Sequence, residues 1–225
     1  MASMIPLGDA SRKPRRFPVV TISIIVLNAF FFFLELTHGQ EFVMQWAEIP
    51  ATIVAGHRFI TLFTAMFLHA GWLHIIGNMV FLWSFGPEIE DAMGRGRYLA
   101  FYLLSGLAAA LAQLAFTPNS TIPNLGASGA IAGVMGAFLI TYPHDQIRSL
   151  FVLGLWTRVT YIPAAVLIGI WFIIQLFNQV GAVAEVQTGG VAYAAHIGGL
   201  IFGAVTARLF ERFRQRGAQF LRGRV

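Results

Sequence analysis

The sequence predicts an all-α polytopic membrane protein, built as a bundle of six transmembrane helices. Of its residues, 57% are hydrophobic and only 11% are charged, whereas an ordinary soluble domain has about 25% charged residues. Six apolar segments are long enough, or nearly so, to cross about 30 Å of hydrocarbon as helices. When the flanks and loops of these segments are assigned alternately to the two sides of the membrane, all of the 15 lysines and arginines except Arg58 fall on the same side. This asymmetry predicts that both termini are cytoplasmic.

The six expected spans divide the chain into three parts. The spans cover residues 18–36, 72–85, 98–116, 128–142, 161–178 and 193–210. Residues 1–17 are expected to be a basic cytoplasmic segment, 18–210 the six-helix membrane domain and 211–225 a basic cytoplasmic tail. The first span lacks a small-residue cleavage site, so we expect an anchor and not a cleaved signal peptide. The tail acts by default as a topology signal, with anionic lipid headgroups or a cytosolic protein as alternative partners.

A further apolar stretch, residues 59–68, lies in the loop after the first span. At about ten residues it is too short to cross the bilayer, which favours an interfacial or re-entrant segment. Counting it as a span would place Ser128 on the cytoplasmic side and destroy the charge asymmetry.

Composition also limits the chemistry. The absence of cysteine excludes disulfides, thiolate zinc sites and a cysteine nucleophile. The net charge of +5 comes from the termini and short loops, with no basic patch interleaved with aromatic residues. Nucleic acid is therefore not an expected partner, and membrane orientation explains the basic residues better.

Three polar clusters interrupt the apolar spans. They are HAGWLHIIGN at 69–78, GASGAIAGVMG at 126–136 and AHIGGLIFG at 195–203. Because the second, fourth and sixth spans all run inward from the outer face, their first turns share one depth. Those turns hold His74, Asn78, Ser128 and His196. The fourth span is short, about 15 residues or about 22 Å, which places Ser128 below the outer surface in a pocket that water reaches.

Glycines predict how these groups meet. Gly129 and Gly133 in the fourth span, and Gly199 and Gly203 in the sixth, form two small-xxx-small faces that allow close backbone approach. Such an approach brings His196 beside Ser128. Helix packing without catalysis is the alternative reading of the same glycines.

The chemistry predicted for this pocket is acyl transfer by a Ser-His dyad. A serine hydroxyl needs a base, and His196 is the histidine of the sixth span. No acidic residue lies centrally in spans two to six, so a dyad is expected, with Glu185 of the outer loop as an outlying third member. His74, Asn78 and the Ser128 backbone N–H are expected to form an oxyanion hole. The alternative is that His74 and Asn78 hydrogen-bond to each other or across helices.

No metal or cofactor is expected. A site built from His69, His74 and His196 is conceivable, but neither an HExxH motif nor a nearby carboxylate supports it. His69 is expected to order its loop by hydrogen bonding.

The motifs resemble those of the rhomboid family of intramembrane serine proteases. They comprise HxxxxHxxxN at His69, His74 and Asn78, ExxxG at Glu90 and Gly94, GASG at 126–129 and AHxGG at 195–199. The resemblance implies a six-helix rhomboid core, Ser128 as nucleophile, His196 as general base, and His74, Asn78 and the Ser128 amide around the oxyanion. It also implies cleavage of transmembrane proteins near the outer face, without cofactor or metal.

The chain departs from the family at two places. Many relatives carry Trp-Arg in the first loop, where this chain has His57 followed by Arg58. Some members place a tyrosine one turn after the serine, beneath the histidine, whereas Ala132 stands here. Support for His196 is therefore expected from elsewhere. Inactive relatives typically lose the serine or the histidine, and both are present.

The expected function is an intramembrane serine endopeptidase that cleaves transmembrane protein substrates near the outer membrane face. The alternatives are a catalytically inactive scaffold that binds transmembrane helices, and a small-solute channel. The loop 180–192 is expected to cap the pocket, and Trp171 and Phe172 either line a lateral opening or face lipid. Membrane lipids surround the bundle, in a bacterial inner membrane or alternatively in an organelle.

Overall fold

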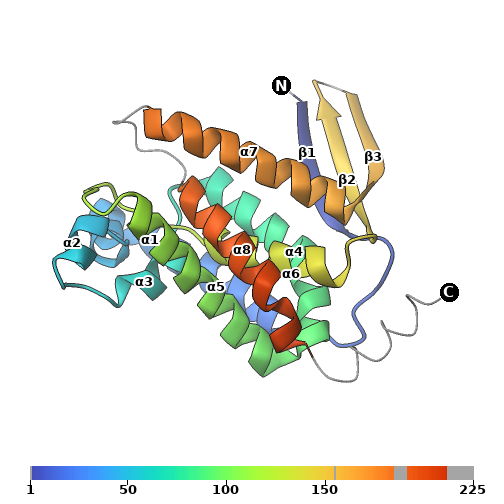
Figure 1. Cartoon of the computed structure of the whole chain (residues 1–225), viewed down its shortest axis with the longest axis horizontal. Helices are drawn as coiled ribbons and strands as arrows, with labels where there is room; N and C mark the ends of the chain where they lie inside the picture. The colour runs from blue at the N-terminus through green and yellow to red at the C-terminus, as the bar shows by residue number, and fades with distance from the viewer. Residues whose placement is uncertain (1, 155, 185–191, 212–225) are drawn as a thin grey trace.

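The computed structural model of the chain describes residues 2–154, 156–184 and 192–211. Most of them are helical (Figure 1). The helices are α1 (Val19–Trp46), α2 (Pro50–Val54), α3 (Thr61–Thr64), the 3-10 helix η1 (Ala65–Phe67), α4 (Trp72–Met93), α5 (Arg95–Phe116), α6 (Ser128–Thr141), α7 (Ala164–Ala184) and α8 (Tyr193–Phe210). The strands are β1 (Ala2–Asp9), β2 (Gln146–Leu153) and β3 (Trp156–Pro163).

Helix α6 forms the centre of the bundle. Its residues from Gly129 to Phe138 are all buried, and it packs against α4, α5 and α8. A helix that is apolar and small all round has no polar face to turn toward solvent and is therefore buried on every side. The first residue of this central helix is Ser128.

Glycines allow α6 and α8 to approach at backbone contact. A Cβ atom built on Gly199 would clash with the carbonyl oxygen of Gly129, and one on Gly203 would clash with the carbonyl oxygen of Gly133. The close approach expected from these two glycine faces is confirmed. It places the N-terminal turns of α6 and α8 side by side.

The membrane spans are only partly confirmed. Among the described residues, three helices are long and apolar enough to cross a membrane, namely α1, α5 and α8. The α3–η1 segment and α4 pass the same test together but meet at an angle of 93°. Helix α6 and residues Ala164–Phe177 of α7 are apolar but shorter. A predominantly helical membrane fold is thus established, and the six-span count stays a prediction.

The expectation of helices alone is wrong at the N-terminus and between α6 and α7. There the three strands form one antiparallel sheet in the order β1-β2-β3. Residues 156–162 are rich in β-branched and aromatic types, which suit a strand, and Gly154 turns the hairpin at φ 61°. Helix α7 consequently begins at Ala164, after Pro163, and not at 161.

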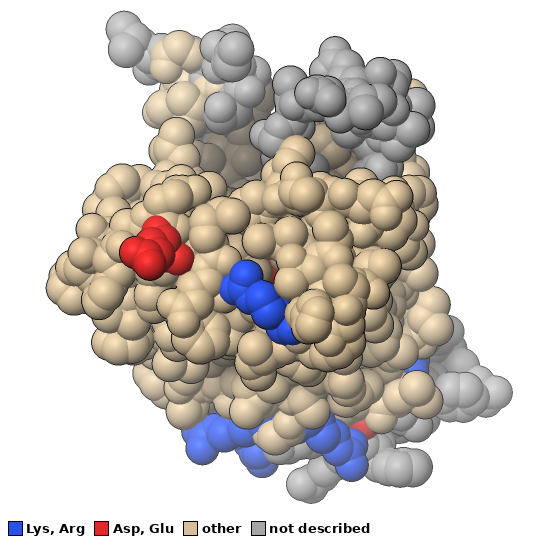
Figure 2. Space-filling view, turned by 90° about the vertical axis from the view of Figure 1, so that its left-hand side faces the viewer, with Lys and Arg blue, Asp and Glu red and all other residues tan. Residues whose placement is uncertain are grey.

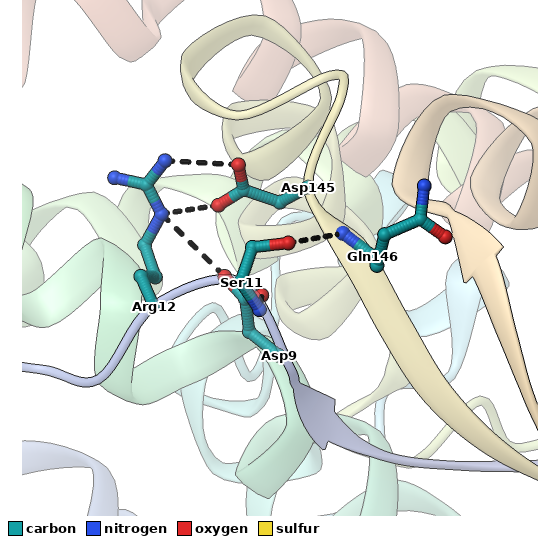
Figure 3. A network of polar contacts seen from close by, with 5 residues as sticks. All are labelled: Asp9, Ser11, Arg12, Asp145 and Gln146. Atoms are coloured by element: carbon teal, nitrogen blue, oxygen red, sulfur yellow. Dashed lines mark hydrogen bonds and ion pairs between the residues drawn. The ribbon is translucent and has the colours of Figure 1, made fainter.

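A cluster of polar contacts fastens β1 to the segment that follows α6 (Figure 3). The guanidinium of Arg12 binds both carboxylate oxygens of Asp145, with Nη2 2.9 Å from Oδ1, and its Nε lies 3.5 Å from Oδ2 of Asp9. The backbone N–H of Gln146 donates to Oγ of Ser11 at 2.7 Å. The N-terminal segment is thereby part of the folded structure.

The outer surface of the bundle is largely uncharged. Figure 2 shows a face that carries few charged side chains, with basic groups gathered along its lower edge. Large apolar side chains are exposed on the helices, among them Phe33, Leu73, Phe177 and Val205, each at 60% or more. An exposed apolar surface of this extent is typical of contact with lipid.

Candidate active site

Ser128 and His196 meet although 68 residues separate them in the chain. Nε2 of His196 lies 2.7 Å from Oγ of Ser128. Ser128 opens α6 and His196 lies in the first turn of α8, so the glycine contacts between these helices set the distance. The imidazole is buried, with 7% of its residue exposed, while Ser128 is partly exposed. This is the arrangement required for a base to take the serine proton.

The other side of the imidazole contacts α7. Nδ1 of His196 lies 2.8 Å from Oε1 of Gln175, which is buried. The indole of Trp171, one turn earlier on α7, lies 5.5 Å from the imidazole between ring centroids. The support that Ala132 does not offer thus comes from a different helix.

Gln175 was not predicted from the sequence. One feature of the sequence could have identified it: Gln175 is the one strongly polar residue in the apolar stretch Ala164–Phe177. A lone polar side chain in such a helix is costly without a partner. Which face it occupies depends on how α7 packs, and residue spacing does not reveal that.

His74 and Asn78 lie one turn apart on α4 and border the cavity that contains Ser128. The backbone N–H of Ala70 donates to Nδ1 of His74 at 3.3 Å, so the ring hydrogen of a neutral His74 is on Nε2. A Cβ built on Gly126 would lie 2.9 Å from this Nε2 and 3.7 Å from Oγ of Ser128. The imidazole of His74 therefore lies close to the serine, in space that a side chain at Gly126 would take.

Asn78 offers a free donor to the same cavity. Its Nδ2 is buried and has no hydrogen-bond partner in the part of the chain that the structure describes. A buried polar group without a partner requires an explanation, and here the amide borders the cavity that contains Ser128. The alternative was that His74 and Asn78 hydrogen-bond to each other or across helices. A bond between the two is not among the described hydrogen bonds.

The cavity beside Ser128 has a volume of about 1310 Å³. Its walls come from α1, α4, α6, α7, α8 and the segments before α4 and α6, and they include Phe32, Trp171 and His196. A space of this size admits a peptide segment together with water.

His69 contributes to the wall of this cavity. Its backbone N–H donates to both carboxylate oxygens of Glu35 at 3.1 Å, and its ring lies edge-on to His74 with centroids 5.1 Å apart. The backbone of His69 thus joins α1 to the start of α4. Both ring nitrogens are buried without a hydrogen-bond partner among the described residues, so ordering of the loop by the histidine side chain stays a prediction. Among the described residues, no group of three or more potential ligands is arranged to hold a metal.

Two expectations fall outside the described part of the chain. Glu185, the outlying third member of the dyad, lies there, as do residues 185–191 of the loop expected to cap the pocket. Within the described residues, no acidic side chain hydrogen-bonds to His196, and Gln175 holds the position that a carboxylate occupies in a triad.

The chain belongs to the rhomboid family, because the family model described as Rhomboid domain matches residues 56–213. It is 32% identical to the Rhomboid protease GluP of Bacillus subtilis over 194 residues, which cover 84% of this chain and 34% of that protein. It is 30% identical to the mitochondrial Rhomboid protein 1 of Saccharomyces cerevisiae over 172 residues, 71% of this chain and 45% of the other.

A third relative, the Rhomboid protease GlpG of Pectobacterium atrosepticum, is 26% identical over 196 residues, 84% of this chain and 61% of that protein. The chain therefore spans between about a third and about three fifths of the length of these relatives. Relatives that are proteases, together with the apolar helices, support a membrane-embedded hydrolase of the rhomboid type.

Proposed function

We propose that the protein is an intramembrane serine endopeptidase, with Ser128 as nucleophile and His196 as general base. The contact of 2.7 Å between Nε2 and Oγ carries this proposal. Oγ attacks the carbonyl carbon of a substrate peptide bond while Nε2 takes the hydroxyl proton. His196 then returns that proton to the leaving amine, which separates from the acyl-enzyme.

Stabilisation of the oxyanion is assigned to three donors. Nδ2 of Asn78 is buried and has no described partner, and the ring N–H of His74 lies beside Ser128. The Ser128 backbone N–H belongs to the first turn of α6, whose N–H groups have no partner within the helix. Donors that are in place before the reaction stabilise the charge as it develops, without reorganisation.

Water completes the cycle by attacking the acyl-enzyme, with Nε2 of His196 again accepting the proton. The substrates proposed are transmembrane proteins, cut near the outer face of the membrane. We also propose that the enzyme lies in a bacterial inner membrane with both termini cytoplasmic. The distribution of lysine and arginine supports this orientation, and reporter fusions at each terminus test it independently.

A serine-directed fluorophosphonate tests the proposal against the inactive-scaffold alternative. Wild type and Ser23→Ala, which removes an exposed serine of α1, are expected to label equally. Ser128→Ala is expected not to label, and His196→Ala to label at least about 100-fold more slowly. Equal labelling of wild type and Ser128→Ala, or no labelling of wild type where a known rhomboid protease labels, would overturn the function.

A further inference from the structure

We propose that Gln175 of α7 is a positioning residue that holds His196 in its productive tautomer. The inference rests on the proposed function of Ser128 and His196 and assigns the group that orients the base. The imidazole lies between two partners, with Nε2 2.7 Å from Oγ of Ser128 and Nδ1 2.8 Å from Oε1 of Gln175. Both ring nitrogens are therefore engaged at hydrogen-bond distance.

The direction of these two bonds decides whether His196 can act as a base. A neutral imidazole has one N–H and one lone pair. For Nε2 to accept the proton of Ser128, the ring hydrogen must be on Nδ1. A carboxamide oxygen only accepts, so Oε1 of Gln175 selects the form with hydrogen on Nδ1. The same bond persists when His196 becomes an imidazolium.

The environment of Gln175 keeps its amide on the imidazole. The residue is 8% exposed and is surrounded along α7 by apolar residues. Burying an amide without a partner is unfavourable, so an alternative rotamer that abandons the imidazole is disfavoured. Trp171, four residues earlier and hence on the same face of α7, packs against the ring as well.

Helix α7 therefore supplies both contacts that orient the base, and α6 supplies the nucleophile. Figure 1 shows α7 along one side of the bundle, with α8 between it and α5. The orientation of His196 depends on α7 being seated against α8. Ser128, His74 and Asn78 belong to α6 and α4.

Three variants and a pH profile test the assignment, with cleavage of a fluorogenic transmembrane peptide in detergent as the assay. Gln175→Leu removes the acceptor and is expected to lower kcat at least tenfold at pH 7, with KM within twofold. Gln175→Glu restores an acceptor, so most of the rate is expected to return. Its negative charge stabilises the imidazolium, which moves the acidic limb of the rate–pH profile to higher pH. Ile174→Ala, an exposed neighbour on α7, should match wild type.

Histidine ¹⁵N NMR of the wild-type protein gives a readout that does not depend on the variants folding. His196 is expected in the form with hydrogen on Nδ1, and its signal is identified by its loss in His196→Gln. The opposite tautomer in wild type would overturn the inference, as would Gln175→Leu with unchanged kcat or Gln175→Glu with an unmoved acidic limb. A wild type without Ser128-dependent cleavage would instead overturn the proposed function, and this inference with it.

Discussion

Asn78 is a buried polar residue on the wall of the cavity beside Ser128. Its buried amide nitrogen has no described partner, although it borders the cavity that holds Ser128. Leaving a buried donor unpaired costs about 1–3 kcal/mol. In the proposed function this donor is directed at the oxyanion and stabilises the negative charge that develops there during the reaction. Under the proposed function, the side chain is expected to matter more to the transition state than to the folded state.

Replacing Asn78 by alanine is expected to lower kcat about 100-fold, with little change in KM, because the lost hydrogen bond forms in the transition state. The thermal midpoint of unfolding should not fall, since no described hydrogen bond is removed. Steady-state cleavage of a transmembrane peptide measures the effect. The control is Ile76→Ala, an exposed position on the same helix. A variant with raised KM and unchanged kcat would show that Asn78 binds substrate and not the oxyanion.

The sequence predicted the proximity of Ser128 and His196, because both lie at the start of glycine-rich spans that run in the same direction. It did not predict Gln175 or the contact of Trp171 with the imidazole. The spacing of residues within a motif shows which of them share a face of one helix. Which face of α7 is directed at His196 depends instead on the rotation of α7 about its axis, which is set by packing against α8. The alanine at 132 indicated only that some other group must support the histidine.

At the scale of elements, Glu90 and Gly94 order the junctions of α4 with α1 and α5. Glu90, at the end of α4, accepts hydrogen bonds from the backbone N–H groups of Val20 and Thr21 at 3.0 and 2.8 Å. It thus satisfies donors at the first turn of α1, which would otherwise be unpaired. Gly94 then turns the chain into α5 with φ 81°, a value that favours glycine. The ExxxG motif is accordingly structural in this chain.

The contact between α6 and α8 predicts a large effect of Gly203→Val. Its Cβ would clash with the carbonyl of Gly133, which is backbone and cannot rotate away. We expect a loss of about 3 kcal/mol or more in the free energy of unfolding, together with loss of cleavage because His196 moves away from Ser128. Thermal unfolding in detergent measures the first effect.

Gly169→Ala on α7 serves as the matched control, since a Cβ there meets nothing within 4 Å. It should be neutral or slightly stabilising, as alanine is the better helix former. Equal stability of Gly203→Val and Gly169→Ala would contradict the packing of α6 on α8.

The sheet was the part of the fold that sequence reasoning missed. Strand β1 precedes the basic residues from which the N-terminal segment was predicted to be cytoplasmic, and its partner β2 follows more than a hundred residues later. Local pattern carries no information about such a distant pairing. The last residues of β3 were assigned to the fifth span because hydropathy alone does not distinguish an apolar strand from the start of a helix.

At the scale of the whole molecule, the attachment of β1 is expected to depend on pH through Asp9. Burial, and then hydrogen bonding to Asp145, raises the pKa of Asp9 from its ordinary value to about 7. The group faces Asp145, Arg12 and Glu88. The folded state thus binds more protons than the unfolded state between about pH 4 and pH 7, and the stability contributed by Asp9 is lost as pH rises through about 7.

Thermal unfolding midpoints measured from pH 5 to pH 8 test this expectation. The midpoint of wild type should fall relative to that of Asp9→Asn, which cannot ionise, as pH rises. Glu41→Gln, an exposed position on α1, is the control for a general loss of negative charge and should follow wild type. Parallel curves for wild type and Asp9→Asn would contradict the raised pKa.

The sheet to which β1 is attached leads directly into α7. Strand β3 ends at Pro163 and α7 begins at Ala164, so no flexible linker separates sheet from helix. Strand β1 pairs with β2, which pairs with β3. The amino-terminal strand is thus connected through the sheet to the helix whose Gln175 contacts His196.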